Sequence, residues 1–260
     1  MKISIITINY NDAVGLEKTI LSVINQSYKA VEYFVIDGGS KDGSVAVIQK
    51  YPDKIDYWLS EPDSGIFNAM NKGIVKATGD YLLFLNSGDV LTNENALQDF
   101  ICHEQFQGDI IYGDYKFENG SKIYPDKLTP LFFFKSSLPH QSTFFKKEVF
   151  AKMGMYNEVY KIVSDREFFI KCFFSNQFKF QHINYELTLF DLSGISNDEK
   201  QLEKKKAEDH KVFLNHFNLF YDDYRLILKL QSELNQEKRK SIKGIMKRIK
   251  NKIIKLCRIR

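Results

Sequence analysis

The chain has 260 residues, of which 43% are hydrophobic and 27% are charged. This size and composition suit a soluble globular protein with one large α/β domain, or one domain with an appendage. The three cysteines are widely spaced and form no Cys-x-x-Cys pair, which argues against a disulfide framework or a zinc site and favours a reducing cytosol. No apolar run approaches the roughly 20 residues that span a bilayer, and the short run after Lys2 predicts no signal peptide.

The formal net charge of +4 is unevenly distributed along the chain. Residues 235–260 hold 11 Lys and Arg and a single acid, Glu237, so this tail carries +10. The preceding 234 residues therefore carry −6. We expect the mildly acidic body and the basic tail to meet different partners.

Four short apolar runs in the first 90 residues are typical of buried strands, because each is rich in aliphatic or aromatic residues and is bounded by turn formers. Segments with helical spacing separate them, and Asp12 and Ser44 are candidate helix caps. The predicted strands are 2–8, 31–36, 55–59 and 81–85, and the predicted helices follow Asp12 and span about 45–51 and 66–76. This alternation predicts a doubly wound, largely parallel sheet with right-handed crossovers.

Each of these strands ends in a polar turn that carries an acid or a glycine, and all four turns should lie on one edge of the sheet. The last of them, Asn86-Ser87-Gly88-Asp89, leaves Asp89 at the carboxyl end of a central strand. Ligands of open α/β sheets bind at that edge. The alternative is an ordinary polar turn after a core strand.

The pattern is less regular beyond Asp89. The asparagine-glycine pair at 119–120 predicts the turn of a hairpin. The other predicted elements are a helix at 94–103, a strand at 109–115, a helix at 164–174, an extended segment at 178–190 that ends near 194–196, and a charged helical region from 198 onward.

Several short motifs follow one another in a fixed order. They are Ser-Ile-Ile-Thr-Ile-Asn-Tyr-Asn at 4–11, Val-Ile-Asp-Gly-Gly-Ser-Lys-Asp-Gly-Ser at 35–44, Ser-Glu-Pro-Asp-Ser-Gly-Ile at 60–66, Asn-Lys-Gly through Ala-Thr-Gly-Asp at 71–80, Phe-Leu-Asn-Ser-Gly-Asp at 84–89, His-Gln at 140–141 and Val-Ser-Asp at 163–165. Together they resemble the family-2 glycosyltransferases with the GT-A fold, over roughly residues 1–197.

The resemblance implies a Rossmann-like, mostly parallel central sheet flanked by helices. It assigns residues 1–197 to the catalytic domain, with a nucleotide-sugar-binding half at 1–90 and an acceptor half at 91–197. Residues 198–260 are then a helical, basic C-terminal extension.

The resemblance also implies roles for single residues. Asp165 would be the catalytic base, Asp89 the metal ligand, and His140 and Gln141 part of the acceptor site. The residues implied to bind the nucleotide are Thr7, Asn9, Tyr10, Asp37, Glu61, Asp63 and Lys72.

One departure from the family concerns the metal site. The family commonly has Asp-x-Asp, whereas this chain has Asn86, Ser87 and Gly88 followed by Asp89, so a single carboxylate remains. One or two carboxylates with substrate phosphates and waters suffice to hold Mg²⁺. We therefore expect a divalent-cation cofactor, Mg²⁺ or Mn²⁺, that is bound more weakly than in the family.

Transfer of a sugar from a nucleotide diphosphate requires neutralisation of the leaving group and a base for the acceptor hydroxyl. Asp89 and Lys72 suit the first need, and Asp165, which opens a helix, suits the second. Glu167 is the alternative base. Without the resemblance, the favoured interpretation of Asp165 is a helix cap or a first-turn acid that offsets the helix dipole. The corresponding alternatives are a turn residue for Asp37 and a satisfied or surface histidine for His140.

The sequence thus predicts an inverting glycosyltransferase that moves a sugar from a nucleotide sugar, a UDP-sugar by preference, to a saccharide or lipid-linked saccharide in surface polysaccharide biosynthesis. The alternative is a non-catalytic nucleotide-sugar-binding protein with a degraded metal motif. The presence of Asp37, Asp89 and Asp165 together favours the enzyme.

The basic tail predicts a further partner. Its apolar residues recur every three or four positions, as on one face of a helix. They are Ile242, Ile245, Met246, Ile249, Ile253 and Leu256. Such a helix suits an anionic membrane surface, which places the protein in the cytoplasm, peripheral on the inner face of the cell membrane. Packing of the stripe on the catalytic body is the alternative. Nucleic acid is not favoured, because the tail has no aromatic residue for base stacking.

Overall fold

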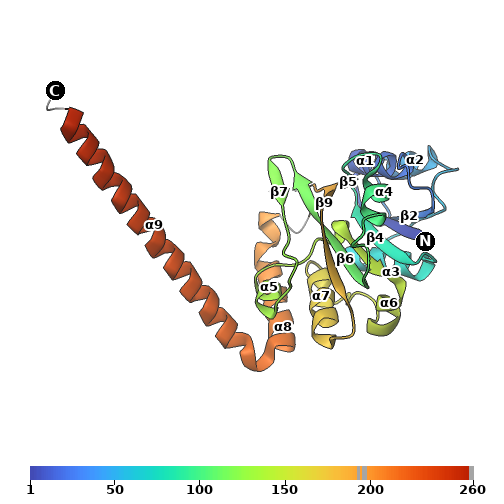
Figure 1. Cartoon of the computed structure of the whole chain (residues 1–260). Coiled ribbons are helices and arrows are strands. Elements are labelled where there is room, and N and C mark those ends of the chain that lie inside the picture. Colours follow the sequence, from blue (N-terminus) through green and yellow to red (C-terminus); the bar gives the residue numbers. More distant parts are fainter. Residues whose placement is uncertain (192–193, 195–197, 258–260) are drawn as a thin grey trace. The chain divides into compact units, whose positions relative to one another are not determined.

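The computed structural model describes residues 1–191, 194 and 198–257 (Figure 1). The chain forms two compact units, Met1–Val212 and Phe213–Arg260. The predicted end of the catalytic domain at 197 falls on residues 195–197, which lie outside the described part. The first unit includes residues that the sequence assigned to the C-terminal extension.

A central sheet of nine strands organises the first unit, in the order β3-β2-β1-β4-β8-β6-β9-β5, with β7 paired to β6. The first half of the chain contributes β1 (Ile3–Asn9), β2 (Val31–Asp37), β3 (Tyr57–Ser60) and β4 (Tyr81–Asn86). These four are mutually parallel, with β1 in the middle between β2 and β4. All seven residues of β1 are buried, as expected for a strand covered on both faces. The predicted doubly wound sheet is confirmed.

The second half of the chain extends the same sheet with mixed pairing. Its strands are β5 (Val90–Leu91), β6 (Ile110–Phe117), β7 (Gly120–Lys122), β8 (Thr143–Lys146) and β9 (Phe180–Leu189). Strand β8 is antiparallel to both β4 and β6, whereas β9 runs parallel to β6. The hairpin predicted at Asn119-Gly120 joins β6 to β7.

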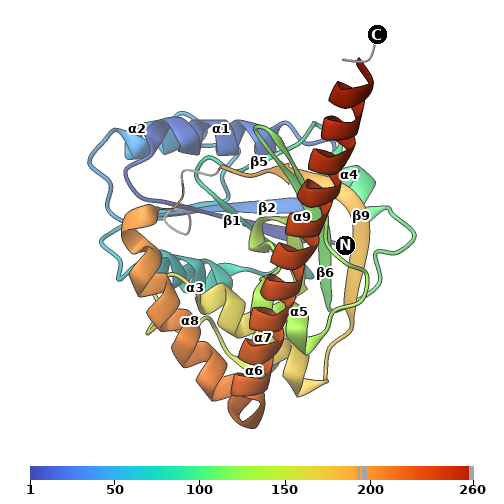
Figure 2. The same ribbon diagram turned by 90° about the vertical axis from the view of Figure 1, so that its left-hand side faces the viewer.

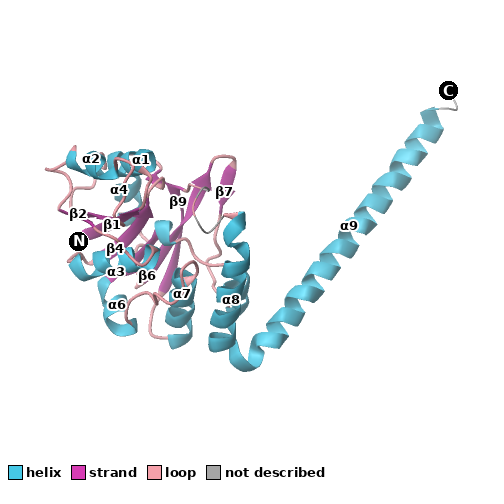
Figure 3. Ribbon diagram, turned by 180° about the vertical axis from the view of Figure 1, so that it is seen from behind, coloured by secondary structure: helices cyan, strands magenta, loops and turns pink. Residues whose placement is uncertain are grey.

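Helices cover both faces of the sheet (Figures 2 and 3). One face carries α1 (Ala13–Ile24), α2 (Ser44–Gln49) and α4 (Ala96–Ile101), and the other carries α3 (Ile66–Lys76), α6 (Lys147–Met153) and α7 (Ser164–Ser175). This unit also contains α5 (Pro130–Lys135), short turns of 3₁₀ helix at His140–Ser142 and Glu199–Gln201, and most of α8 (Leu202–Phe217).

Of the two predicted helix caps, Asp12 is confirmed and Ser44 is wrong. Asp12 caps α1 as expected, because its carboxylate accepts a hydrogen bond from the Gly15 N–H at 2.9 Å. Ser44 is not the cap of α2: the N-cap is Gly43, at φ +98°, and Ser44 is the first helical residue. The Ser44 hydroxyl and N–H both donate to Asp42 instead.

A cluster of aromatic rings joins the two halves of the sheet on the face of α3. Phe84 of β4 and Phe145 of β8 lie 6.0 Å apart between ring centroids, and Phe150 of α6 is 4.8 Å from Phe168 of α7. Tyr156 contacts Phe84, Phe150 and Phe168. Because buried aromatic rings contribute large apolar areas, this cluster holds the start of α7 in a defined place beside β4.

Glu32 ties β1, β2 and the turn before β4 together at the amino edge of the sheet. Its carboxylate accepts hydrogen bonds from the Ser4 hydroxyl and the Thr78 and Gly79 N–H groups, and the Lys2 ammonium lies 2.6 Å away. Burial alone would raise the pKa of Glu32, but hydrogen bonds from Lys2, Ser4 and Thr78 outweigh it and lower the pKa to about 2. The ionised side chain therefore stabilises the fold at neutral pH.

We expect Glu32→Gln to lower the free energy of unfolding at pH 7 by about 1–3 kcal/mol, because buried donors lose their anionic partner. The native pKa lies below the ordinary value of 4.5, so this stabilisation is complete above pH 4.5 and disappears as the pH falls through about 2. Urea denaturation of both proteins between pH 7 and 2.5 measures the difference, which should narrow with acid. A difference that is constant with pH would contradict this role.

The second unit consists chiefly of α9 (Tyr221–Cys257), a helix of 37 residues. Among the described residues, the apolar side chains of α9 that are more than half exposed are Leu226, Leu230, Leu234, Ile242, Ile245 and Met246. Among the described residues, no helix is both long enough and apolar enough to cross a membrane.

Candidate functional site

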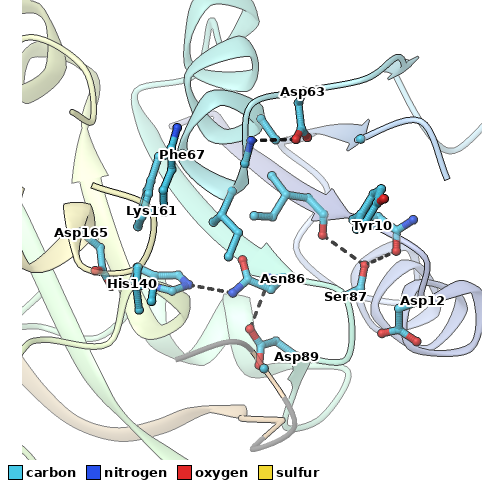
Figure 4. Close-up of a pocket in the computed structure, with 18 of the residues that line it drawn as sticks. Tyr10, Asp12, Asp63, Phe67, Asn86, Ser87, Asp89, His140, Lys161 and Asp165 are labelled. Carbon is cyan, nitrogen blue, oxygen red and sulfur yellow. Dashed lines mark hydrogen bonds and ion pairs between the residues drawn. The ribbon is translucent and has the colours of Figure 1, made fainter. Parts of the chain in front are cut away.

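A cavity of about 850 Å³ opens at the carboxyl ends of β1 and β4 (Figure 4). The start of α3 and the segment that leads into α7 form its other walls. Six of the residues singled out from the sequence line it. They are Asn9, Tyr10, Asp63, Asp89, His140 and Asp165.

The parallel register explains why the strand ends meet here. Asn9, the last residue of β1, is paired with Asp37, the last residue of β2, and Ile8 is paired with Asn86, the last residue of β4. The Asn9 amide donates to Asp37 at 2.6 Å, while its carbonyl accepts from the Ser87 hydroxyl at 2.7 Å. Side chains from three strands are thereby joined at one edge.

Asp37 does not line the cavity, because its carboxylate is engaged by the turn that follows β2. It accepts hydrogen bonds from the Gly39 and Ser40 N–H groups and from the Ser40 and Ser60 hydroxyls, besides Asn9. Burial acts to raise the pKa of Asp37, but these hydrogen bonds outweigh it, so its pKa lies below the ordinary value. The side chain holds the 37–40 turn in the shape that borders the cavity at Gly38.

Four other residues singled out from the sequence also lie outside the cavity lining. Thr7 is fully buried and accepts a hydrogen bond from the Tyr33 hydroxyl at 3.0 Å. Lys72 and Glu61 form an ion pair at 2.8 Å. Gln141 is buried in the 3₁₀ turn next to His140. Their assigned roles remain predictions.

Tyr10 and Asp63 flank a narrow part of the cavity beside Gly38. The Tyr10 side chain is exposed, and Asp63 accepts a hydrogen bond from the Gly65 N–H at 2.9 Å. A Cβ atom at position 38 would lie 2.7 Å from the Asp63 carboxylate and 3.2 Å from the Tyr10 ring. Glycine at position 38 therefore lets both side chains approach closely, and they offer a flat aromatic ring and a hydrogen-bond acceptor to a ligand.

His140 links the two sides of the cavity. Its Nδ1 lies 3.1 Å from Asp165 Oδ2 at the start of α7, and its Nε2 lies 3.1 Å from Asn86 Nδ2 at the end of β4 (Figure 4). Burial lowers the pKa of His140, but the hydrogen bond and charge of Asp165 outweigh it, so its pKa is raised. The imidazole thus holds Asp165 at a fixed distance from the strand edge.

The protonation state of His140 follows from which atoms donate and which accept in its hydrogen bonds with Asn86 and Asp165. With the amide N–H of Asn86 facing Nε2, the neutral imidazole carries its proton on Nδ1 and donates it to Asp165. Turning the Asn86 amide over would offer its oxygen to an imidazolium instead. In the present orientation Asn86 Oδ1 is buried without a hydrogen-bond partner among the described residues.

Asp89 occupies the floor of the cavity. Its Oδ1 accepts from the Asp191 N–H at 3.0 Å and its Oδ2 from the Asn86 N–H at 3.2 Å. Burial raises the pKa of Asp89 to about 7 despite these bonds. Gly88, at φ +94°, brings the Asp191 carboxylate close, because a Cβ atom there would lie 2.4 Å from Asp191 Oδ2.

Asp89 and Asp191 are two carboxylates that lie close together at the floor of the cavity. Among the described residues, no group of three or more His, Cys, Asp or Glu side chains is arranged to hold a metal ion. Asp89 and Asp191 nevertheless both line the cavity. Mg²⁺ is commonly held by one or two carboxylates while substrate phosphates and water complete its coordination, so the donor set fits a cation that arrives with a phosphorylated ligand.

Sequence reasoning missed three charged residues that line the cavity, namely Lys161, Lys204 and Asp191. The Lys161 ammonium donates to the Ser64 carbonyl at 3.0 Å, which ties the segment before α7 to the start of α3. None of the three belongs to a motif, and Asp191 is more than 100 residues from Asp89 in the chain. Only the fold brings them together.

Residues 4–156 match the profile of the family described as Glycosyl transferase family 2. The chain belongs to this family. A relative named as an uncharacterized glycosyltransferase of Mycobacterium tuberculosis H37Rv is 34% identical over 177 residues, which cover 65% of this chain and 68% of the relative. A second, of Mycobacterium bovis BCG, is named as a PGL/p-HBAD biosynthesis glycosyltransferase and is 28% identical over 205 residues, 75% of this chain and 78% of the relative.

Solved structures agree on the fold. Staphylococcus aureus TarS, residues 1–349 with UDP-GlcNAc, has a TM-score of 0.65 at 19% identity, over 83% of this chain and 67% of that one. In another TarS structure this chain covers 44% of the solved chain, at a TM-score of 0.62. The Pyrobaculum calidifontis mannosyltransferase PcManGT, in complex with GDP-Man and Mn²⁺, has a TM-score of 0.50 at 14% identity, over 71% of this chain and 55% of that one. The GT-A type of α/β fold is thus confirmed.

Gly88→Ala tests whether the floor of the cavity depends on the approach of Asp191. Gly43→Ala is the matched control, because both glycines have positive φ but a Cβ at Gly43 would meet nothing within 4 Å. We expect each change to cost about 1–2 kcal/mol of backbone strain, with a further loss only for Gly88→Ala. Glycosyl transfer should fall in Gly88→Ala and persist in Gly43→Ala. Equal melting temperatures and activities would contradict the assignment.

Proposed function

We propose that the protein is an inverting glycosyltransferase that transfers a sugar from a UDP-sugar to a hydroxyl of a saccharide or lipid-linked saccharide. One observation carries this proposal: Asp165 is held by His140 across the cavity from the carboxyl edge of the parallel strands. A donor at that edge and an acceptor beside Asp165 would meet in the cavity between them. A carboxylate and an imidazole in this arrangement suit the proton transfer that a single displacement requires.

The nucleotide would bind between the β1 end and the start of α3. The exposed Tyr10 ring offers a stacking surface to the base, and Asp63 offers an acceptor to the base or ribose. Asp37, Asn9 and Ser40 would support this part by fixing the turn at Gly38. The TarS structures with UDP and UDP-GlcNAc support a UDP-sugar through their common fold. Thr7 and the Lys72–Glu61 pair do not line the cavity, and they would contribute by holding β1 and α3 in place.

The diphosphate would lie toward Asp89, together with a divalent cation. When bound, Mg²⁺ or Mn²⁺ supplies positive charge that stabilises the leaving diphosphate. Asp89 and Asp191 would hold it, and Lys161 and Lys204 add positive charge to the same cavity. The Mn²⁺ in the mannosyltransferase complex supports this assignment.

The acceptor hydroxyl would approach Asp165, which takes its proton while the hydroxyl oxygen attacks the anomeric carbon. His140 orients the carboxylate, and Gln141 supports the turn that carries His140. Glu167, the alternative base, is buried and does not line the cavity. The position of Asp165 therefore favours it as the base.

Asp165→Asn should lower kcat by roughly 10²–10⁴-fold, the range for a positioned general base. The amide keeps the size of the side chain but cannot accept a proton. Donor binding, followed as thermal stabilisation by UDP-sugars with Mg²⁺ or Mn²⁺, should be unchanged. Near-normal turnover in this variant, or a wild-type protein that binds a nucleotide sugar but transfers nothing, would contradict the proposed catalysis.

A lipid-linked acceptor and a basic helix would both place the protein at a membrane surface. In α9, Ile242, Ile245 and Met246 are exposed, and the last two lie three and four residues after the first, within a segment rich in Lys and Arg. We propose that α9 binds an anionic membrane on the cytoplasmic face, in the manner of an interfacial helix.

Lys243→Glu with Lys247→Glu should weaken co-sedimentation of the full chain with vesicles that contain anionic lipid by at least about tenfold, because each basic residue near such a surface contributes about 1 kcal/mol. Transfer to a soluble acceptor should not change. Arg225→Glu with Lys229→Glu, in the first part of the same helix, is the control and should bind as the wild type does. Equal binding by all three proteins would contradict the proposal.

A further inference from the structure

Helix α8 contributes a buried acid to the segment that precedes Asp165. Glu208 is only 8% exposed. Its Oε1 accepts a hydrogen bond from the Lys161 N–H at 2.9 Å, and its Oε2 accepts from the Ile162 N–H at 2.9 Å and the Val163 N–H at 3.3 Å. One carboxylate thus satisfies three consecutive backbone donors, although it lies 45 residues further along the chain.

Asp209, the next residue of α8, holds Arg166, the residue that follows Asp165 in the chain. The Asp209 carboxylate forms an ion pair with the Arg166 guanidinium at 2.8 Å. Arg166 also donates to the carbonyls of Phe133 and Phe134, at the end of α5. Its own N–H donates to Asp165 Oδ1 at 2.8 Å. The segment before the proposed base and the residue that follows it are therefore both held from α8.

In the described part of the chain, the backbone N–H groups at 161–163 find their hydrogen-bond acceptor in Glu208 rather than in a neighbouring turn. Val163, the N-cap residue of α7, provides no side-chain hydrogen bond to the helix. Buried backbone N–H groups must be satisfied, and here the partner comes from a distant helix. Lys161 and Ile162 both line the cavity, so the segment that Glu208 holds is itself a wall of the site.

Lys204 shows that α8 takes part in the site directly. It lies four residues before Glu208, on the same side of the helix, and lines the cavity. Both residues belong to the unit Met1–Val212. They lie well beyond residues 4–156, the part that matches the family profile.

We propose that Glu208 is a positioning residue of glycosyl transfer, which fixes the backbone at 161–163 so that Asp165 is aligned with the acceptor hydroxyl. This inference rests on the proposed function. Misplacement of a reacting group by about 1 Å costs up to about 10²-fold in rate. Loss of the Glu208 hydrogen bonds should therefore lower kcat, while the nucleotide part of the cavity at Tyr10 and Asp63 is left intact.

The test compares Glu208→Gln with Glu203→Gln in the full chain. Glu203 lies on the same helix, but its side chain is 86% exposed and pairs with Lys206, one turn further along. Glutamine keeps the size of Glu208 but turns an N–H₂ group toward backbone donors. Three quantities are measured for each protein: kcat and the donor KM, the melting temperature, and hydrogen exchange of the amides at 161–163.

We expect Glu208→Gln to lower kcat by about 10–100-fold with a donor KM within about twofold of the wild type, and to accelerate amide exchange at 161–163. Glu203→Gln should match the wild type in all three. Unchanged kcat or unchanged exchange in folded Glu208→Gln would overturn the proposal. So would a loss of melting temperature with kcat intact at permissive temperature, which is the signature of a purely structural role.

The experiment also covers a Glu208→Gln variant that does not fold and a wild-type protein that transfers no sugar. If Glu208→Gln does not fold, Asp209→Asn releases Arg166 from the same helix and should give the same fall in kcat. If the wild type shows no transfer from any nucleotide sugar, the proposed function fails, and the exchange measurement alone decides whether Glu208 fixes the segment. Exchange equal to that of the wild type would then overturn the positioning role as well.

Discussion

The parallel pairing of β1 with β2 on one side and β4 on the other is the constraint on which the site depends. Parallel strands end at the same edge of a sheet, so the register brings Asn9, Asp37 and Asn86 together without any contribution from the loops. The Asn9 side chain then forms hydrogen bonds with Asp37 and with Ser87, which follows β4, and so joins the turn at Gly38 to the turn that carries Asp89. The strand ends thus form a rigid half of the cavity, which suits recognition of a nucleotide.

The other half of the cavity depends on side chains that are distant in sequence. Strand β8 runs antiparallel to β4 and brings Phe145 of the aromatic cluster into contact with Phe84. The cluster in turn holds the start of α7 beside the carboxyl end of β4. His140 then spans the remaining gap between Asn86 and Asp165. Helix α8 completes the arrangement through Glu208. The catalytic half is therefore assembled from packing and from buried hydrogen bonds, both of which are sensitive to small displacements.

The alternating apolar runs sufficed to predict the parallel sheet, and the helix at 66–76 was predicted with its observed bounds. The sequence also indicated six of the cavity-lining residues through the family motifs. It did not reveal that the Asp37 carboxylate is occupied by hydrogen bonds from its own turn and from Asn9 and Ser60, because these bonds depend on the tertiary structure. Nor did it indicate Asp191, Lys204 or Glu208, since isolated charged residues in ordinary surroundings carry no pattern, and only tertiary structure places them beside the site.

The most direct test of the account is the anomeric configuration of the product, determined by proton NMR, after transfer from a UDP-sugar of known configuration. A single displacement, with Asp165 as the base and the donor at the strand edge, predicts a product of inverted configuration. The same measurement on the slow reaction of Asp165→Asn should show no change in stereochemistry. A product with retained configuration would contradict the single displacement and the role assigned to Asp165.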